Sequence, residues 1–207
     1  MGRPSKPLIS REAATQVALE VICADGLQAF SLGSVAKRLG VKTPSLYYHF
    51  SDKWELLSAV ARQLLLEVRD AGSGEKDWES RLITLCVETR RSILRHPQAA
   101  SLLLQFFPRH LLLDAYDETV QHYPFPPELH MVIVEGTEKL TFGSILFEAS
   151  ARSRDVPAMP DVDPAVHPHL ARSLAANPYD EEALFIEALR MFIAGVRVRA
   201  DALAGGE

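Results

Sequence analysis

The sequence predicts an all-α fold of about nine or ten helices, and three observations carry that prediction. Apolar residues recur three and four positions apart over most of the chain, which is the spacing of one face of a helix. No segment shows the alternation of apolar and polar residues that marks a half-buried strand. Hydrophobic residues make up 47% of the 207 residues, so there is ample apolar material for a buried core.

The first expected helix runs from Arg11 to Ala24. Ser10 is placed to cap it, and Ile9 can pack beside the cap as a hydrophobic staple. Gly26 is expected to end it, because glycine tolerates the backbone conformation that follows a helix. The expected buried stripe consists of Ala14, Val17, Ala18, Val21 and Ile22.

Two short helices joined by a tight turn are expected between Ser31 and Phe50. Ser31 is a good N-cap for the first, and Gly40 can take the positive φ that its end requires. In the second, Thr43 is expected to be the cap and Pro44 the first helical residue. Leu46 and Phe50 are expected to face inward, which leaves Ser45, Tyr47, Tyr48 and His49 on the other faces.

A helix, a glycine turn and a second helix with free hydrogen-bonding side chains are typical of a DNA-reading helix-turn-helix. The start of the second helix carries Lys42, Thr43 and Ser45, which suit a phosphate. The alternative is a plain helical hairpin with surface tyrosines. Tyr47 and Tyr48 are suited to sugar-phosphate and thymine methyl groups, whereas His49 and Lys53 can each contact a phosphate.

The run LGSVAKRLGVKTPSLYYHFSDKWELL, preceded by one amphipathic helix, resembles the N-terminal DNA-binding domain of the TetR family of transcriptional regulators. The resemblance covers about the first third of the chain and implies that the second short helix approaches DNA. Gly33 stands where some relatives carry a base-reading basic side chain, so the operator sequence is left open. The expected DNA-binding residues are Arg3, Lys6, Ser31, Lys42, Thr43, Pro44, Ser45, Tyr47, Tyr48, His49 and Lys53.

Arg3 and Lys6 belong to a proline-containing arm over residues 1–8. Such an arm can lie along a phosphate backbone or enter a minor groove, or it can be an ordinary frayed terminus. The charge pattern supports a basic N-terminal part that binds DNA, the reader, attached to an acidic remainder, the body. Residues 1–62 carry a net charge of +3 and the remainder carries −8.

The body is expected to contain further helices, separated by glycine and proline. A break at residues 71–74 follows a long connecting helix, and we place the functional division at 1–54 and 55–207. A proline-rich acidic loop is expected over residues 153–168. The expected helices cover residues 52–69, 77–96, 97–107, 109–121, 128–152, 167–176 and 180–203.

The segments LRHPQAASLLL, LTFGSILFEASARS and EALFIEALRMFIAGVRV, with the acidic loop, resemble the regulatory domain of the tetracycline-repressor branch more weakly. This resemblance implies a homodimer through the two long late helices, which would bring two readers to a palindromic operator. The small residues Gly136, Gly143, Ser144 and Gly195 would allow close approach of the copies, although the same helix faces could instead build only the monomer's own core.

The resemblance also implies a small-molecule effector, which the aromatic content of the middle helices suggests is apolar or amphipathic. No residue defines its identity. The alternative is a helical protein that binds a small molecule or a partner without reading DNA. The expected ligand-binding residues are Leu103, Phe106, Phe107, His110, Tyr116, His130, Met131, Glu135, Phe142 and Leu146.

Other classes of function lack their signatures. The sequence contains no HExxH or CxxC metal motif, no glycine-rich phosphate loop and no nucleophile elbow, so we expect neither a cofactor nor a metal nor an enzyme. No apolar run reaches membrane-spanning length and no secretory segment is apparent, so we expect no membrane partner and a cytoplasmic protein. Cys23 and Cys86 are expected to pack as small hydrophobes.

Overall fold

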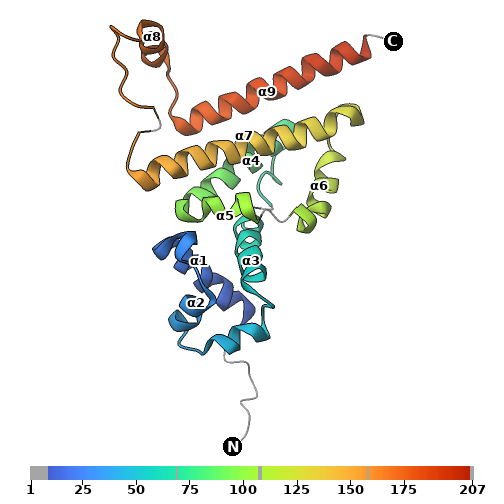
Figure 1. The fold of residues 1–207 in the computed structure, drawn as a ribbon. Coiled ribbons are helices and arrows are strands. Elements are labelled where there is room, and N and C mark those ends of the chain that lie inside the picture. The colour runs from blue at the N-terminus through green and yellow to red at the C-terminus, as the bar shows by residue number, and fades with distance from the viewer. Residues whose placement is uncertain (1–8, 69, 107–108, 158, 206–207) are drawn as a thin grey trace, which may run out of the picture. The chain divides into compact units, whose positions relative to one another are not determined.

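The computed structural model describes residues 9–68, 70–106, 109–157 and 159–205, which form nine α-helices, three 3₁₀ helices and no strand (Figure 1). The all-α prediction is confirmed for this part of the chain. The described residues divide into two compact units, one drawn from residues 9–68, 92–106 and 109–115, the other from residues 70–91, 116–157 and 159–205. The expected division of roles at residue 54 stays a prediction, because compact packing does not report on function.

The first unit is built around the N-terminal helices. It contains α1 (Arg11–Ala29), α2 (Leu32–Arg38), the 3₁₀ helix η1 (Thr43–Tyr48), α3 (Lys53–Leu66), η2 (Pro97–Ala99), α5 (Ala100–Gln105) and η3 (Arg109–Leu111). Helix α1 packs against α2, α3 and η2, while α2 packs against η1 and α3 against α5. The largest fully buried side chains here are Ile22, Leu46, Phe50, Leu56, Leu57, Leu64, Ile93 and Leu102.

Helix α1 begins at the expected cap and is interrupted at the expected glycine. The Ser10 hydroxyl accepts a hydrogen bond of 3.0 Å from the Ala13 amide, which confirms the predicted cap. Gly26 interrupts the helix with φ +78°, a conformation that favours glycine. The first helical segment therefore ends at Gly26, as expected, and a short second segment continues within α1 to Ala29.

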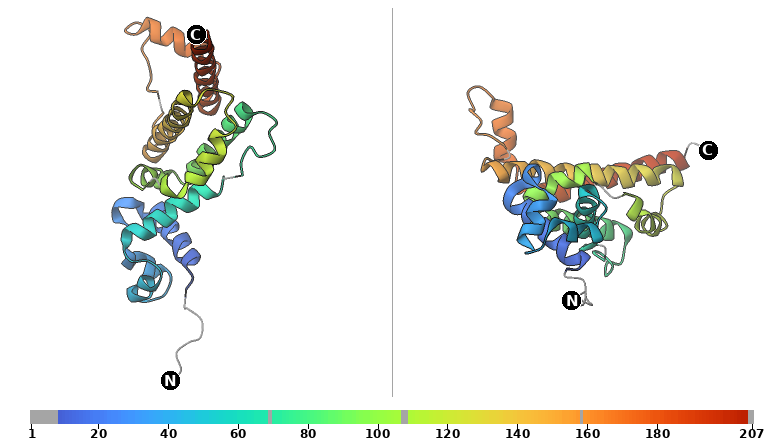
Figure 2. Two further views of the ribbon diagram at one scale, coloured as in Figure 1. Left: turned by 90° about the vertical axis from the view of Figure 1, so that its right-hand side faces the viewer. Right: turned by 60° about the horizontal axis from the view of Figure 1, so that its bottom comes forward.

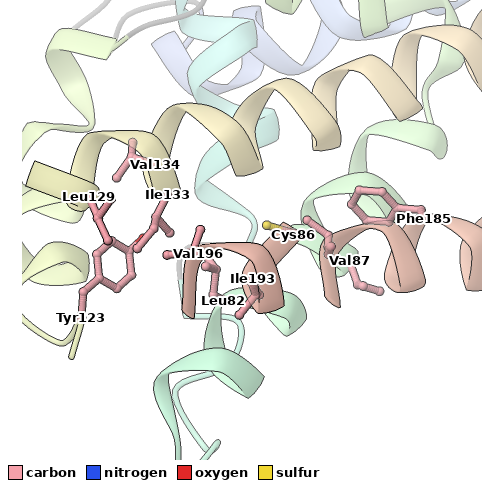
Figure 3. Close-up of a cluster of buried hydrophobic side chains, with 11 residues drawn as sticks. Leu82, Cys86, Val87, Tyr123, Leu129, Ile133, Val134, Phe185, Ile193 and Val196 are labelled. Carbon is pink, nitrogen blue, oxygen red and sulfur yellow. The ribbon is translucent and has the colours of Figure 1, made fainter. Parts of the chain in front are cut away.

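The second unit is organised around two long helices. It contains most of α4 (Trp78–Leu94) and α6 (Leu113–Val120), with α7 (Pro127–Arg154), α8 (Pro168–Ala176) and α9 (Glu181–Ala204). Helices α7 and α9 pack side by side (Figures 1 and 2). Their core with α4 is shown in Figure 3 and consists of Leu82, Cys86, Val87, Tyr123, Leu129, Ile133, Val134, Phe185, Leu189, Ile193 and Val196.

One glycine of α7 is required by packing within the chain. A Cβ atom at Gly136 would overlap the ring tip of Phe192 on α9 and lie 2.8 Å from its Cε2 atom. The expectation that Gly136 serves close approach between two copies is therefore corrected, since a neighbour in the same chain fills its space. Beyond the adjoining backbone of their own helices, Gly143 and Gly195 have no atom of the described residues within 4 Å of such a Cβ.

A buried arginine joins three helices of the second unit. Arg90 on α4 is 3% exposed, and its guanidinium contacts the Glu148 carboxylate and donates to the Ser144 hydroxyl at 3.1 Å, both on α7. It also lies 3.5 Å from the Glu182 carboxylate on α9. A buried charge needs such partners, and the Glu148 carboxylate, which contacts the guanidinium directly, offsets most of the cost of its burial.

The segment between α7 and α8 contains no helix in its described residues, as expected. Helix α7 ends at Asp155, which takes the left-handed conformation with φ 50°. None of the described helices combines the length and the apolar run needed to cross a bilayer. Both cysteines are free: Cys86 is buried, whereas Cys23 is half-buried and lies 3.6 Å from Nδ1 of His96.

Candidate nucleic-acid interface

Helix α2 and the turn after it have the geometry that the sequence predicts. The hydroxyl of Ser31 accepts from the Ser34 amide, and the Ser34 hydroxyl accepts from the Ser31 amide, each at 3.1 Å. Gly40 has φ +69°, and the next amide, of Val41, donates to the Ala36 carbonyl at 3.0 Å. These local contacts set the direction in which the chain enters η1.

The second helix of the pair differs from the prediction. It is a six-residue 3₁₀ helix whose N-cap is Lys42, so Thr43 is its first residue and Pro44 its second. The expected cap by Thr43 is wrong, since no side chain caps this helix. A short proline-containing segment favours the tighter i+3 hydrogen bonds of a 3₁₀ helix.

One face of η1 is buried and the other is free. Leu46 is fully buried and Phe50, just beyond the helix, is 1% exposed. Tyr47 is 55% exposed and Tyr48 is 79% exposed, while His49 is half-buried. Two aromatic side chains with polar tips therefore stand on the surface, held there by a rigid apolar anchor.

The remaining predicted DNA-binding residues differ in exposure. Lys42 and Pro44 are exposed, and Thr43 and Ser45 are half-buried. The Lys53 ammonium donates to the Phe30 carbonyl at 2.9 Å, so this half-buried lysine already has one partner inside the unit. Arg3 and Lys6 lie outside the described residues.

Exposed lysine and arginine side chains at the end of α2 were absent from the predicted site. Lys37 and Arg38 occupy the last turn, immediately before the Gly40 turn. Positive charge is favourable at a helix C-terminus, which gives these residues a structural reason to be there as well. In the sequence, only their place in the run KRLG, directly before the expected glycine turn, could have indicated that they belong to the interface.

Arg11 is another residue whose role was missed by sequence reasoning. Its guanidinium donates to the His49 carbonyl and to the Glu55 carboxylate, the latter at 2.7 Å. It also lies over the Phe50 ring, 4.4 Å from the centroid. The partners are 38 and 44 residues away along the chain, so no local pattern could have revealed them.

The predicted ligand-binding residues fall in both units. In the first unit, Leu103 is buried, His110 is exposed and Phe106 stacks on Trp54 with ring centroids 5.1 Å apart. Phe107 lies outside the described residues.

In the second unit, the Tyr116 hydroxyl donates to the Glu138 carboxylate, and His130 Nε2 donates to the Phe125 carbonyl at 2.8 Å. Glu135 pairs with Lys139, and Met131 is 58% exposed. Phe142 and Leu146 are half-buried. The predicted pocket therefore stays a prediction.

The Tyr123 hydroxyl in the second unit is buried without a hydrogen-bond partner in the described structure, and the buried Thr141 hydroxyl faces the Cys86 thiol, a weak hydrogen-bonding group. Burial raises the pKa of Tyr123, and it raises the pKa of the Cys86 thiol to about 11. Both groups are therefore neutral near pH 7, and the Cys86 thiol is a poor nucleophile there.

Comparisons with known proteins agree on one family. Residues 14–60, which include α2, the turn and η1, match the family described as bacterial regulatory proteins, tetR family. The tetracycline repressor protein class D of Escherichia coli is 28% identical over 204 residues, covering 94% of this chain and 92% of the relative.

Solved structures share the fold along nearly the whole chain. A "possible TetR family transcriptional regulator" from Streptomyces coelicolor A3(2) is 25% identical with a TM-score of 0.76, over 91% of this chain and 99% of that one. A variant of TetR from Acinetobacter baumannii AYE in complex with minocycline is 20% identical with a TM-score of 0.74, over 93% and 95%.

Proposed function

This chain belongs to the TetR family of transcriptional regulators, and on that premise we propose that it is a DNA-binding repressor released from its operator by a small molecule. The observation that carries the proposal is η1, whose buried Leu46 leaves Tyr47 and Tyr48 exposed on the second helix of a helix-turn-helix. Tyrosine rings suit sugar and thymine methyl groups, and their hydroxyls suit phosphate oxygens.

Phosphate contacts would orient the reader on the duplex. Lys42 at the N-cap of η1 is exposed, and Thr43 and Ser45 bring hydroxyls to the same end. These groups, with the predicted arm residues Arg3 and Lys6, would supply sequence-independent and salt-sensitive affinity. We assign base reading to the tyrosines and orientation to the basic and hydroxyl groups.

We further propose a homodimer through α7 and α9. Both helices leave large apolar side chains exposed, including Phe147 at 81% and Met191 and Val198 at 69% each. Met191, Gly195 and Val198 share one face of α9 by their spacing, and Gly195 leaves room there for a neighbouring helix. Two chains related by a twofold axis would read a palindrome, which supplies specificity that one six-residue helix lacks.

The effector is proposed to be apolar or amphipathic and to bind in the body. The minocycline complex of a TetR variant with this fold supports small-molecule binding, and the aromatic side chains Tyr116 and Phe142 of the second unit support an apolar site there. We expect no catalytic step, and we place the protein in the cytoplasm with its DNA.

A gel-shift assay with DNA upstream of the protein's own gene and of adjacent genes tests the proposal. We expect a sequence-selective, salt-sensitive shift that the double substitution Tyr47→Ala with Tyr48→Ala abolishes. Tyr179→Ala is the matched control, because Tyr179 is also exposed, at 42%, but lies before α9. Failure of every fragment to shift selectively would favour a helical binding protein without a DNA-reading role.

Release by a ligand needs its own measurement. A panel that includes minocycline is screened by thermal shift, and each hit is added to the protein–DNA complex. Thermodynamic linkage requires a ligand that weakens DNA binding to bind the DNA-free protein more tightly by the same factor. A hit that raises the melting temperature and leaves DNA affinity unchanged would contradict coupling between the two sites.

A further inference from the structure

We propose that Arg11 is a positioning residue of the DNA reader: it fixes the C-terminal end of η1 and does not itself bind a phosphate. The inference rests on the proposed DNA-binding function and goes beyond it by naming what sets the reader's orientation. A single guanidinium at the start of α1 contacts the end of η1 and the start of α3.

Each of the two terminal nitrogens of Arg11 donates one hydrogen bond. One donates to the His49 carbonyl, which is the C-cap of η1, and the other donates to Glu55 Oε1 on α3 at 2.7 Å. The planar group also lies over the ring of Phe50, 4.4 Å from its centroid. Guanidinium is suited to this role, because its fixed fork can hold two acceptors at once.

Helix η1 needs an external support at this end. A helix of six residues has few internal hydrogen bonds, and at its C-terminal end the amides of His49 and Phe50 both donate to the Leu46 carbonyl, at 2.9 and 3.0 Å. Leu46 anchors the buried face of η1, and Phe50 anchors the chain just beyond it. The contact to the His49 carbonyl adds a polar restraint between these two anchors, next to Tyr47 and Tyr48.

Glu55 is itself held in place. Its second oxygen accepts from the Ser51 amide at 2.7 Å and from the Ser51 hydroxyl at 2.9 Å. Hydrogen bonds from the Ser51 amide, Arg11 and the Ser51 hydroxyl lower the pKa of Glu55 to about 2. The carboxylate is therefore charged throughout the pH range of a DNA-binding assay, and the ion pair with Arg11 persists.

The same contacts argue that Arg11 is not a phosphate ligand. Its two terminal nitrogens face acceptors within the protein, and turning toward DNA would give up both contacts. Loss of Arg11 should therefore change how well the protein discriminates among sequences. The number of phosphates that it neutralises should stay the same.

The test uses the full chain, a duplex that the wild type selects from a random DNA pool, and a scrambled duplex of equal length. For Arg11→Met we expect the specific Kd to weaken by about 10- to 100-fold. The Kd for scrambled DNA should change by less than about threefold, and the salt dependence of specific binding should keep its slope. Arg62→Met, an exposed arginine of α3, controls for loss of one positive charge.

Three results would overturn the proposal. A fall of the salt slope by about 0.9 with both affinities weakened would make Arg11 a phosphate ligand. A lowered melting temperature with unchanged discrimination would make it merely structural. Full recovery by Arg11→Lys would show that charge alone suffices, whereas we expect lysine to recover at most part of the loss because it lacks the fork.

A second variant covers the case in which Arg11→Met does not fold. Glu55→Gln keeps a side-chain oxygen for Ser51 and removes the ion pair, so we expect a smaller loss of discrimination in the same direction. Unaltered discrimination in folded Glu55→Gln would overturn the proposal. If the wild type selects no sequence at all, the proposed function fails, and that outcome is distinct from any result with the variants.

Discussion

Gly136→Ala tests the packing of α7 on α9, because the added methyl group would enter the space of the Phe192 ring. Replacing a helical glycine by alanine ordinarily stabilises a protein by about 0.5–1 kcal/mol. Overpacking of a filled site costs about 1–3 kcal/mol, because the neighbour must leave its preferred position. The clash involves a ring tip that can move, so we expect a net loss of about 1–2 kcal/mol in the free energy of unfolding.

The assay is urea denaturation at fixed chain concentration, since dimerisation would make stability concentration-dependent. Gly33→Ala is the control, because its Cβ would lie 3.7 Å from the Ser31 hydroxyl, an ordinary contact. In a Phe192→Ala background the clash is absent, so Gly136→Ala should there stabilise by about 0.5–1 kcal/mol. Stabilisation by Gly136→Ala in the wild-type background would refute the packing argument.

Three further predictions concern separate parts of the chain. Tyr47→Ala should weaken operator binding by about 1–3 kcal/mol in fluorescence anisotropy while size-exclusion chromatography shows an unchanged dimer, and equal affinity would remove Tyr47 from the reader. Thr141→Val should cost less in urea denaturation than Thr137→Val, because the Thr141 hydroxyl interacts with the Cys86 thiol, a weak hydrogen-bonding group, whereas the Thr137 hydroxyl donates to the Ile133 carbonyl at 2.7 Å and its loss should cost about 1 kcal/mol. In the folded protein the pKa of Glu55 is lowered from 4.5 to about 2, so the ionised carboxylate stabilises the fold above pH 4.5 and this stabilisation is lost as the pH falls toward 2. Glu55→Gln should therefore flatten this part of a curve of unfolding free energy against pH. An unchanged curve would contradict the assignment.

The sequence predicted features that depend on neighbours a few residues away. Ser10 and Ser31 were recognised as N-caps because each precedes a helical apolar pattern, and each accepts the expected amide hydrogen bond. Gly40 was recognised because a short helix followed by another needs a residue with positive φ. The helix-turn-helix segment contains several such caps and turn residues close together. For this reason it was also the part of the chain with the most specific family resemblance.

Features that depend on distant residues could not be predicted. Nothing near Arg11 in the sequence indicates the His49 carbonyl or Glu55, and nothing near Gly136 indicates Phe192. The 3₁₀ geometry of η1 was missed because helical spacing over six residues does not separate it from an α-helix. The ligand-binding residues remain predictions for a related reason: a pocket depends on how separate helices are placed, which local patterns do not specify.

Selection from a random pool of duplex DNA, followed by sequencing, tests most directly whether paired copies of η1 read DNA. We predict enrichment of an inverted repeat whose half-sites lie about one helical turn or somewhat more apart, and loss of that enrichment when Tyr47 and Tyr48 are replaced by alanine. A wild-type pool with no enriched sequence, or with one unrepeated element, would contradict the account.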